Sequence, residues 1–228
     1  MNPSTFRDLN KNGRLDPYED SRLPIEERVE DLLAQMTLEE KAGLMFHTII
    51  GIAPDGSLDS TGGPFPMPTA VEMVSVRKMS HFNVHQLPGT RKAVEWHNQL
   101  QKLAEDTRLG IPVTISSDPR HAYTTNIALG ASSDMFSKWP EQIGLAATGD
   151  EILVEEFGDI ARQEYLAVGI RVALHPMADL ATEPRWARNN GTFGEDAQLS
   201  ARLTAAYIRG FQGKTLGSQS VASSAPAP

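Results

Sequence analysis

Apolar residues along the chain recur at two spacings, and the two spacings alternate. Helical spacing predicts four amphipathic helices, over residues 24–36, 90–105, 151–168 and 195–209. Short apolar runs predict buried strands within residues 43–50, 74–84, 111–116 and 170–174. A capping-box sequence at residues 37–40 starts one further short helix. Strands that alternate with helices, joined by short helix-to-strand turns, predict βαβ units and a parallel sheet.

Both ends of the chain lack this periodicity, as does one internal stretch. Residues 1–23 are polar and rich in turn formers, and residues 51–70 have the Gly, Pro, Ser and Asp content of a surface loop. Residues 214–228 are of low complexity. We therefore expect a polar N-terminal arm (1–23), an α/β body (24–213) and a disordered tail (214–228).

The composition of the chain argues against several classes of function. The chain has 228 residues with 21 basic and 29 acidic side chains, a net charge of -8, which argues against a nucleic-acid partner. It has no cysteine, which excludes disulfide scaffolds and Cys nucleophiles. No apolar stretch approaches the ~18 residues of a membrane span, and we see no signal peptide at the N-terminus. We expect no membrane partner and, if the start is genuine, a cytoplasmic location.

Two polar segments follow predicted strands. Ligand sites of parallel α/β folds form at the carboxyl ends of strands. Residues 117–121 and 176–196 lie there, and together they hold several Asp and Arg residues, a His, a Trp and two Asn. We therefore expect the functional site to be built from these two segments.

The same segments carry a family resemblance. RLGIPVTISSDPRHA and HPMADLATEPRWARNNGTFGED, together with RVEDLLAQMTLEEKAG near the start, resemble glycoside hydrolase family 3, which includes β-glucosidases and related exo-acting β-glycosidases. The resemblance implies a TIM-like barrel and retaining hydrolysis of a terminal β-linked sugar, by an Asp nucleophile and a separate acid/base carboxyl. It implies a carbohydrate partner and no cofactor for catalysis. Members of the family are often exported.

Two sugar contacts carry over by resemblance. Asp118 of SSDPRHA corresponds to a family Asp that binds sugar hydroxyls, and Arg185, the first Arg of EPRWAR, corresponds to an Arg that reaches the same sugar. A carboxylate accepts hydrogen bonds from paired hydroxyls, and a guanidinium offers a fork of donors. The alternatives are a turn Asp and a surface ion pair of Arg185 with Glu195 or Asp196. Further residues could line or support the pocket: His121, Trp186 and Arg188.

The chain also departs from the family pattern. A Lys-His motif and an Asp nucleophile are expected beyond residue 213, and neither occurs. A complete barrel takes about 250 residues. We therefore expect a partial TIM (β/α)8-type barrel, truncated about half way, that holds part of a substrate pocket and is inactive alone. The alternatives are a non-catalytic carbohydrate- or calcium-binding polypeptide, or half of a split enzyme completed by a complementing chain.

Residues 8–19 match the EF-hand calcium loop at every ligand position. Gly13 allows the sharp turn, and the candidate Ca²⁺ ligands are Asp8, Asn10, Asn12, Arg14 through its carbonyl, Asp16 and Glu19. Only seven residues precede Asp8, so the entering helix is missing, and no second loop pairs with it. The alternative is an Asx-rich turn.

Other motifs favour structural roles. His81 and His85 lack the Glu of H-E-x-x-H, so a zinc site is not expected, and no nucleophile elbow or phosphate-binding loop occurs. Glu195 and Asp196 stand at the start of a predicted helix, where N-terminal capping explains them.

Overall fold

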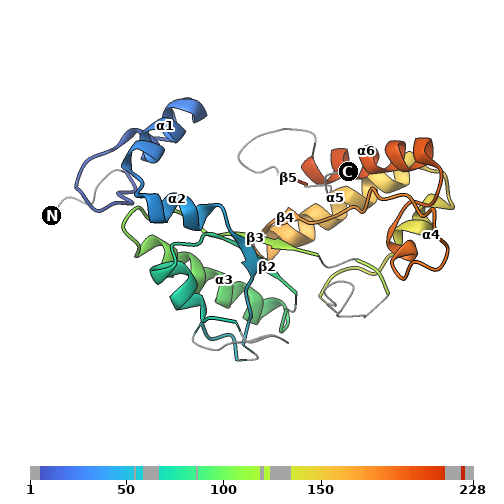
Figure 1. Cartoon of the computed structure of the whole chain (residues 1–228), viewed down its shortest axis with the longest axis horizontal. Coiled ribbons are helices and arrows are strands. Elements are labelled where there is room, and N and C mark those ends of the chain that lie inside the picture. The colour runs from blue at the N-terminus through green and yellow to red at the C-terminus, as the bar shows by residue number, and fades with distance from the viewer. Residues whose placement is uncertain are drawn as a thin grey trace.

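A parallel sheet runs through the molecule, with its strands in chain order. The computed structural model describes residues 6–53, 55–58, 67–85, 87–118, 121–123, 135–213 and 222–223. Each strand pairs in parallel with the next one along the chain (Figure 1). The strands are β1 (His47–Ile49), β2 (His81–Val84), β3 (Thr114–Ser117), β4 (Ile170–Ala173) and β5 (Ala222–Ser223). This is the strand order of part of a (β/α)8 barrel, as expected.

Helices connect the strands. The α-helices are α1 (Ile25–Gln35), α2 (Leu38–Leu44), α3 (Thr90–Glu105), α4 (Gln142–Ala146), α5 (Glu151–Ala167) and α6 (Ala197–Gln212). Three short helices lie between them: η1 (Pro17–Glu19), η2 (Glu72–Val76) and η3 (Asn189–Gly191). In Figure 1, α3 lies with the strands β1–β3, whereas α4, α5 and α6 lie together on the other side of the molecule. None of the helices in the described ranges is long and apolar enough to cross a membrane.

The helix ends follow from local sequence. The capping box is formed: the Thr37 side chain accepts the N–H of Glu40, and the Glu40 side chain accepts the N–H of Thr37. Asp150 accepts from the first turn of α5, and Asp196 accepts the N–H of Leu199 in α6. Gly169 ends α5 with φ +85°, a conformation that glycine adopts without strain. The capping interpretation of Asp196 is confirmed.

One apolar core packs α3, α5 and α6 against the sheet. Phe82 and Val84 of β2 and Ile115 of β3 are buried with Trp96 and Leu100 of α3. Because side chains alternate along a strand, the opposite face of β2 and β3 carries polar side chains, among them His81, Asn83 and Ser116. The inner face of this partial barrel is therefore polar near β2 and β3.

Several predicted boundaries were wrong. The run 43–50 is not one strand, because α2 continues to Leu44 and only His47–Ile49 pairs. The run 74–84 begins inside η2, and the short helix α4 was not predicted. The helix predicted over 195–209 runs further, to Gln212, so that Gly210 lies inside α6. Most of the tail 214–228 lies outside the described residues, but Ala222–Ser223 pairs with β4.

Candidate functional site

The candidate site residue Asp118 stands at the carboxyl end of the sheet. It directly follows β3 and is half-buried. Ser117 of β3 pairs with Ala173 of β4, and the N–H of Leu174 donates to the Ser117 carbonyl at 3.1 Å. Asp118 therefore leaves the sheet beside the chain that leads from β4 into the EPRWAR loop. This is the place where parallel α/β enzymes bind substrates.

A buried polar network lies beneath this edge, and its only signal in the sequence is a His directly after a predicted strand. His175, which follows β4, is 4% exposed. The Tyr165 hydroxyl of α5 lies 3.0 Å from His175 Nε2, and the Tyr207 hydroxyl of α6 lies 2.8 Å from His175 Nδ1. Burial raises the pKa of both phenols well above the usual value, and the Asp118 charge adds to the rise at both. The Asp118 carboxylate is thus near enough for its charge to act on both phenols.

His121 lies behind the site. Its side chain is buried and stacks on Phe136 at 4.7 Å between ring centroids. Its Nε2 atom is 2.9 Å from Glu164 Oε2, at an angle outside that of a hydrogen bond. Burial outweighs the Glu164 charge and lowers the pKa of His121 to about 4. His121 and His175 both line a cavity of about 20 Å³, which places His121 beside the buried network.

The two arginines of the EPRWAR loop, Arg185 and Arg188, lie in different surroundings. The Arg185 side chain is 89% exposed and forms two hydrogen bonds to the Glu183 carboxylate, at 2.9 and 2.8 Å. That guanidinium lowers the pKa of Glu183 to about 2. The ion pair of Arg185 considered with Glu195 or Asp196 is thus made with Glu183 instead.

Arg188 and Trp186 are half-buried, in contrast to Arg185. Arg188 Nη2 lies 3.3 Å from the sulfur of Met177, a buried residue just beyond β4. The backbone N–H of Trp186 donates to the Glu183 carbonyl, which closes the loop. Arg188 therefore points back toward the carboxyl end of β4, whereas Arg185 points to solvent.

The N-terminal loop adopts an EF-hand-like curl. Asp8 accepts the N–H groups of Asn12 and Gly13, at 3.1 and 2.8 Å, and Gly13 has φ +78°. Glu19 closes the loop by accepting the N–H groups of Leu9 and Asp16. The amides of Asn10 and Asn12 both donate to Asp16 Oδ2, at 2.6 and 2.7 Å.

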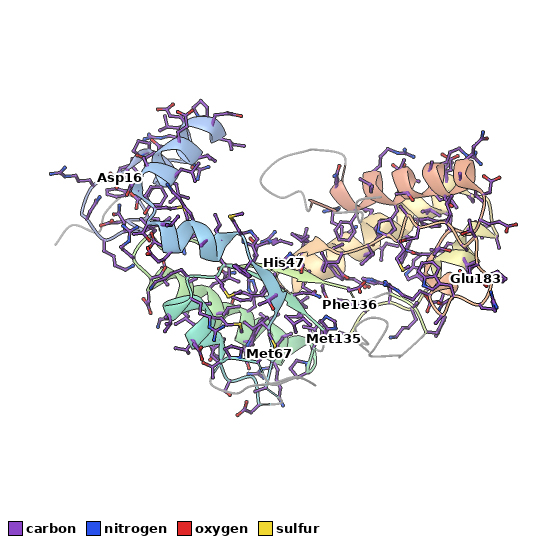
Figure 2. The ribbon with its side chains drawn as sticks, viewed as in Figure 1. Asp16, His47, Met67, Met135, Phe136 and Glu183 are labelled. Atoms are coloured by element: carbon purple, nitrogen blue, oxygen red, sulfur yellow. The ribbon has the colours of Figure 1, made fainter. Side chains whose placement is uncertain are left out.

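The loop is anchored to the body. The Tyr18 hydroxyl is buried and donates to the Leu109 carbonyl, and Lys11 Nζ donates to the carbonyls of Glu105 and Thr107. Gly110 leaves room for Leu9, since a Cβ at Gly110 would lie 2.9 Å from the Leu9 carbonyl oxygen. In Figure 2, Asp16 of this loop and Glu183 of the EPRWAR loop lie at opposite ends of the molecule.

Histidines on the inner face of the sheet pair with hydroxyls and amides. His47 Nε2 lies 2.6 Å from Ser116 Oγ, His81 Nδ1 lies 3.1 Å from Ser80 Oγ, and His85 bonds Asn83. Across the part of the chain that the structure describes, no three His, Cys, Asp or Glu side chains group as a metal site would need. The sequence reasoning missed the His47–Ser116 contact, because 69 residues separate the two.

Comparisons with known proteins agree with this fold. A solved β-glucosidase from Erythrobacter marinus superposes with a TM-score of 0.72 at 21% identity, covering 91% of this chain and 26% of that one. The periplasmic β-glucosidase/β-xylosidase of Dickeya chrysanthemi is 51% identical over 98% of this chain and 34% of its own length. Probable β-glucosidase C of Aspergillus oryzae is 50% identical over 90% of this chain and 32% of its own length.

The chain thus spans about a third of the length of these two curated relatives. The model of the glycosyl hydrolase family 3 N-terminal domain matches residues 67–225, a range that includes β2 to β5, Asp118 and the EPRWAR loop. The α1 and α2 helices precede this range. The chain therefore belongs to glycosyl hydrolase family 3 and carries sequence of its N-terminal domain.

Proposed function

We propose that this chain supplies sugar-binding residues to a retaining, β-glucosidase-like site. The observation that carries the proposal is the place of Asp118, a half-buried carboxylate directly after β3, at the substrate end of the parallel sheet. There it accepts hydrogen bonds from hydroxyls of a terminal β-linked sugar. The Lys-His and Asp nucleophile motifs do not occur in these 228 residues, so we propose that this chain alone does not hydrolyse glycosides.

An arginine of the EPRWAR loop supplies the second sugar contact. The resemblance points to Arg185, but the geometry favours Arg188. Arg185 is 89% exposed and forms an ion pair with Glu183, whereas Arg188 is half-buried and contacts Met177 beside β4. A half-buried guanidinium that faces the strand ends is better placed to share a sugar with Asp118 than one that faces solvent.

Glucose titration of the 228-residue chain, followed by protein NMR, tests both residues. Saturable binding is expected for the unmodified chain, together with its loss in Asp118→Ala and a weakening of about tenfold or more in Arg188→Ala, the size of a charged hydrogen bond. Asp106→Ala, an exposed Asp after α3, is the matched control. Unchanged binding in Asp118→Ala would refute the pocket assignment. If glucose binding is lost in Arg185→Ala but not in Arg188→Ala, the second sugar contact is Arg185.

A complementing chain is part of the proposal. The Dickeya relative has about two thirds of its length outside the match, and the catalytic carboxyls are proposed to come from such a polypeptide. Size-exclusion chromatography of this chain mixed with that remaining part should show a joint peak. Separate elution of the two would contradict a split enzyme.

We also propose an exported location for the protein in its working form, because the Dickeya relative is named as periplasmic. Fractionation of the source cells, with an antibody against this chain, tests the location. Recovery with the cytoplasmic fraction alone would contradict export.

A second candidate function is calcium binding by residues 8–19. The Gly13 N–H donates to the Asp8 carboxylate, and this hydrogen bond sets the turn of an EF-hand loop. Glu19 stands at the closing position of the loop. Both observations favour calcium binding. Ion binding would require the Asn10 and Asn12 amide groups to release Asp16 and to turn their oxygens, which accept loop N–H groups, toward the ion. The ion would be structural, because this loop lies far from the EPRWAR loop (Figure 2).

Calorimetric titration with CaCl₂ tests this loop. Heat is expected at or below about millimolar Ca²⁺, within the range of EF-hand sites, and its loss is expected in Glu19→Gln. Glu39→Gln, on the exposed face of α2, is the control. No heat at millimolar Ca²⁺ would leave the loop as an Asx-rich turn and refute the calcium proposal.

A further inference from the structure

The first helix, α1, has the sequence pattern of a packed helix but exposes its apolar side chains. Ile25, Val29 and Leu33 recur four residues apart, so they form one apolar stripe along α1. They are 70%, 46% and 43% exposed, and none of the eleven residues of α1 is buried. A helix of a globular protein normally turns such a stripe toward a core, so this stripe lacks the cover that its sequence pattern calls for.

The contacts that α1 makes lie on a different face. Figure 1 shows α1 at one end of the molecule, beside the N-terminal loop. Arg28 donates to the Tyr18 carbonyl at 3.2 Å, and Asp31 accepts the Tyr18 N–H at 3.1 Å. Gln35 accepts from the Asn10 amide at 3.3 Å. Positions 28, 31 and 35 share one helix face, so these polar contacts hold α1 in place without covering the apolar stripe.

The apolar stripe of α1 has an acidic border. Glu26, Glu27 and Glu30 are all exposed on the same helix. Interfaces pair an apolar centre with a polar rim, and the charges of two partners are arranged to be complementary. The stripe therefore suits a partner surface that is apolar at its centre and carries Lys or Arg around it.

The length of the relatives indicates where such a partner surface comes from. The Dickeya relative matches 98% of this chain, and the uncovered 2% is fewer residues than α1 contains, so the match extends into α1. This chain spans 34% of that relative, in which the segment similar to α1 is accompanied by about twice as much further sequence. The remaining two thirds of such a polypeptide are therefore available to cover the stripe.

We propose that the apolar stripe of α1 is the docking surface for the complementing chain, the polypeptide that carries the remaining part of a family 3 enzyme. Its apolar surface packs on Ile25, Val29 and Leu33, and its basic side chains lie against Glu26 and Glu30. The inference rests on the complementing chain proposed above and names the surface that receives it.

Calorimetric titration of this chain with the remaining part of the Dickeya relative tests the stripe. Ile25→Glu should weaken the association about tenfold or more, because it places a charge in the apolar contact beside an acidic border. Ile152→Glu is the matched control, because Ile152 is an exposed isoleucine in the first turn of α5, and its association should be unchanged. Equal affinity of Ile25→Glu and the unmodified chain would overturn the inference.

A charge reversal tests the acidic border. At low salt, Glu30→Lys should weaken the association about fivefold, the upper size of an exposed ion pair. Glu156→Lys, an exposed position on α5, is the control and should leave the affinity unchanged. An affinity that Glu30→Lys leaves unchanged or raises would refute a basic partner surface.

Thiol labelling reports on the same surface without adding a charge to it. The chain has no cysteine, so Val29→Cys introduces a single thiol into the stripe. Its reaction with a maleimide, followed on this chain by mass spectrometry, should be lost when the remaining part of the Dickeya relative is bound. Ile152→Cys should react at the same rate in both states. A Val29→Cys thiol that reacts equally in both states would contradict docking at α1.

The outcomes separate this inference from the proposed complementation. If the unmodified chain does not associate with the remaining part of the relative, complementation and its docking surface are both refuted. If it associates, but Ile25→Glu associates equally well, complementation stands and docking at α1 is refuted. If the chain alone forms a dimer that Ile25→Glu dissociates, the stripe binds a second copy of this chain and the inference is overturned.

Discussion

Gly210→Ala is the most direct test of how α5 and α6 are held together. Gly210 lies inside α6 and faces the backbone of α5. A Cβ atom at this position would lie 1.9 Å from the Glu155 carbonyl oxygen and 2.9 Å from the Asp159 nitrogen. Both obstacles are backbone atoms, so no side chain can rotate away. The helices would have to separate.

The size of the effect follows from two opposing contributions. Alanine is about 1 kcal/mol better than glycine inside a helix, which favours the variant. Overpacking a tight contact costs typically about 1–3 kcal/mol, and a contact roughly 1.5 Å too short against backbone belongs at or above the upper end. We therefore expect a net loss of about 2 kcal/mol in the free energy of unfolding.

Urea unfolding followed by circular dichroism measures this loss. With a slope of about 2 kcal/mol per molar urea, the midpoint should fall by about 1 M. Gln198→Ala, exposed on the same helix, should stay within about 0.5 kcal/mol of the unmodified chain. A Gly210→Ala midpoint equal to or above that of the unmodified chain would refute the close packing of α5 on α6.

Further predictions concern pH, capping and the N-terminal loop. The pKa of buried His121 is about 4 when folded and about 6.5 when unfolded, so its neutral form stabilises the fold above pH 6.5, and this stability is lost as the pH falls toward 4. Urea unfolding at pH 7 and pH 5 should differ by on the order of 2 kcal/mol, and His121→Gln should remove most of that difference. Asp150→Ala should lower the free energy of unfolding by about 1 kcal/mol, because Asp150 caps α5, whereas exposed Glu156→Ala should not. Gly13→Ala should weaken Ca²⁺ binding in calorimetry, because φ at Gly13 is +78°; an unchanged affinity would count against the loop conformation.

Local sequence predicted the long elements well. The helix over 90–105 has the predicted bounds, since its apolar face of Trp96 and Leu100 is regular and buried. The strand at 43–50 was overestimated, because an apolar run cannot show where α2 ends and β1 begins. The helix α4 has only five residues, too few for a period to be seen.

The site was only partly predictable. The positions of Asp118 and the EPRWAR loop follow from the rule that ligands bind at strand ends. The Tyr165–His175–Tyr207 network could not be predicted, because its members lie 10 and 32 residues apart on different elements. The predicted helix over 195–209 stops short of Gly210, a residue inside α6 that only the contact with α5 explains. Such contacts depend on tertiary packing, which no local pattern records.

We propose that this chain holds sugar-binding residues of a family 3 site whose catalytic carboxyls come from outside it. The measurement that decides this is hydrolysis of an aryl β-glucoside, by the chain alone and by the chain mixed with the remaining part of the Dickeya relative. We predict no hydrolysis above buffer and host-enzyme controls by either polypeptide alone, activity in the mixture, and its loss when the chain carries Asp118→Ala. Hydrolysis by this chain alone, or full activity of the Asp118→Ala mixture, would contradict the account.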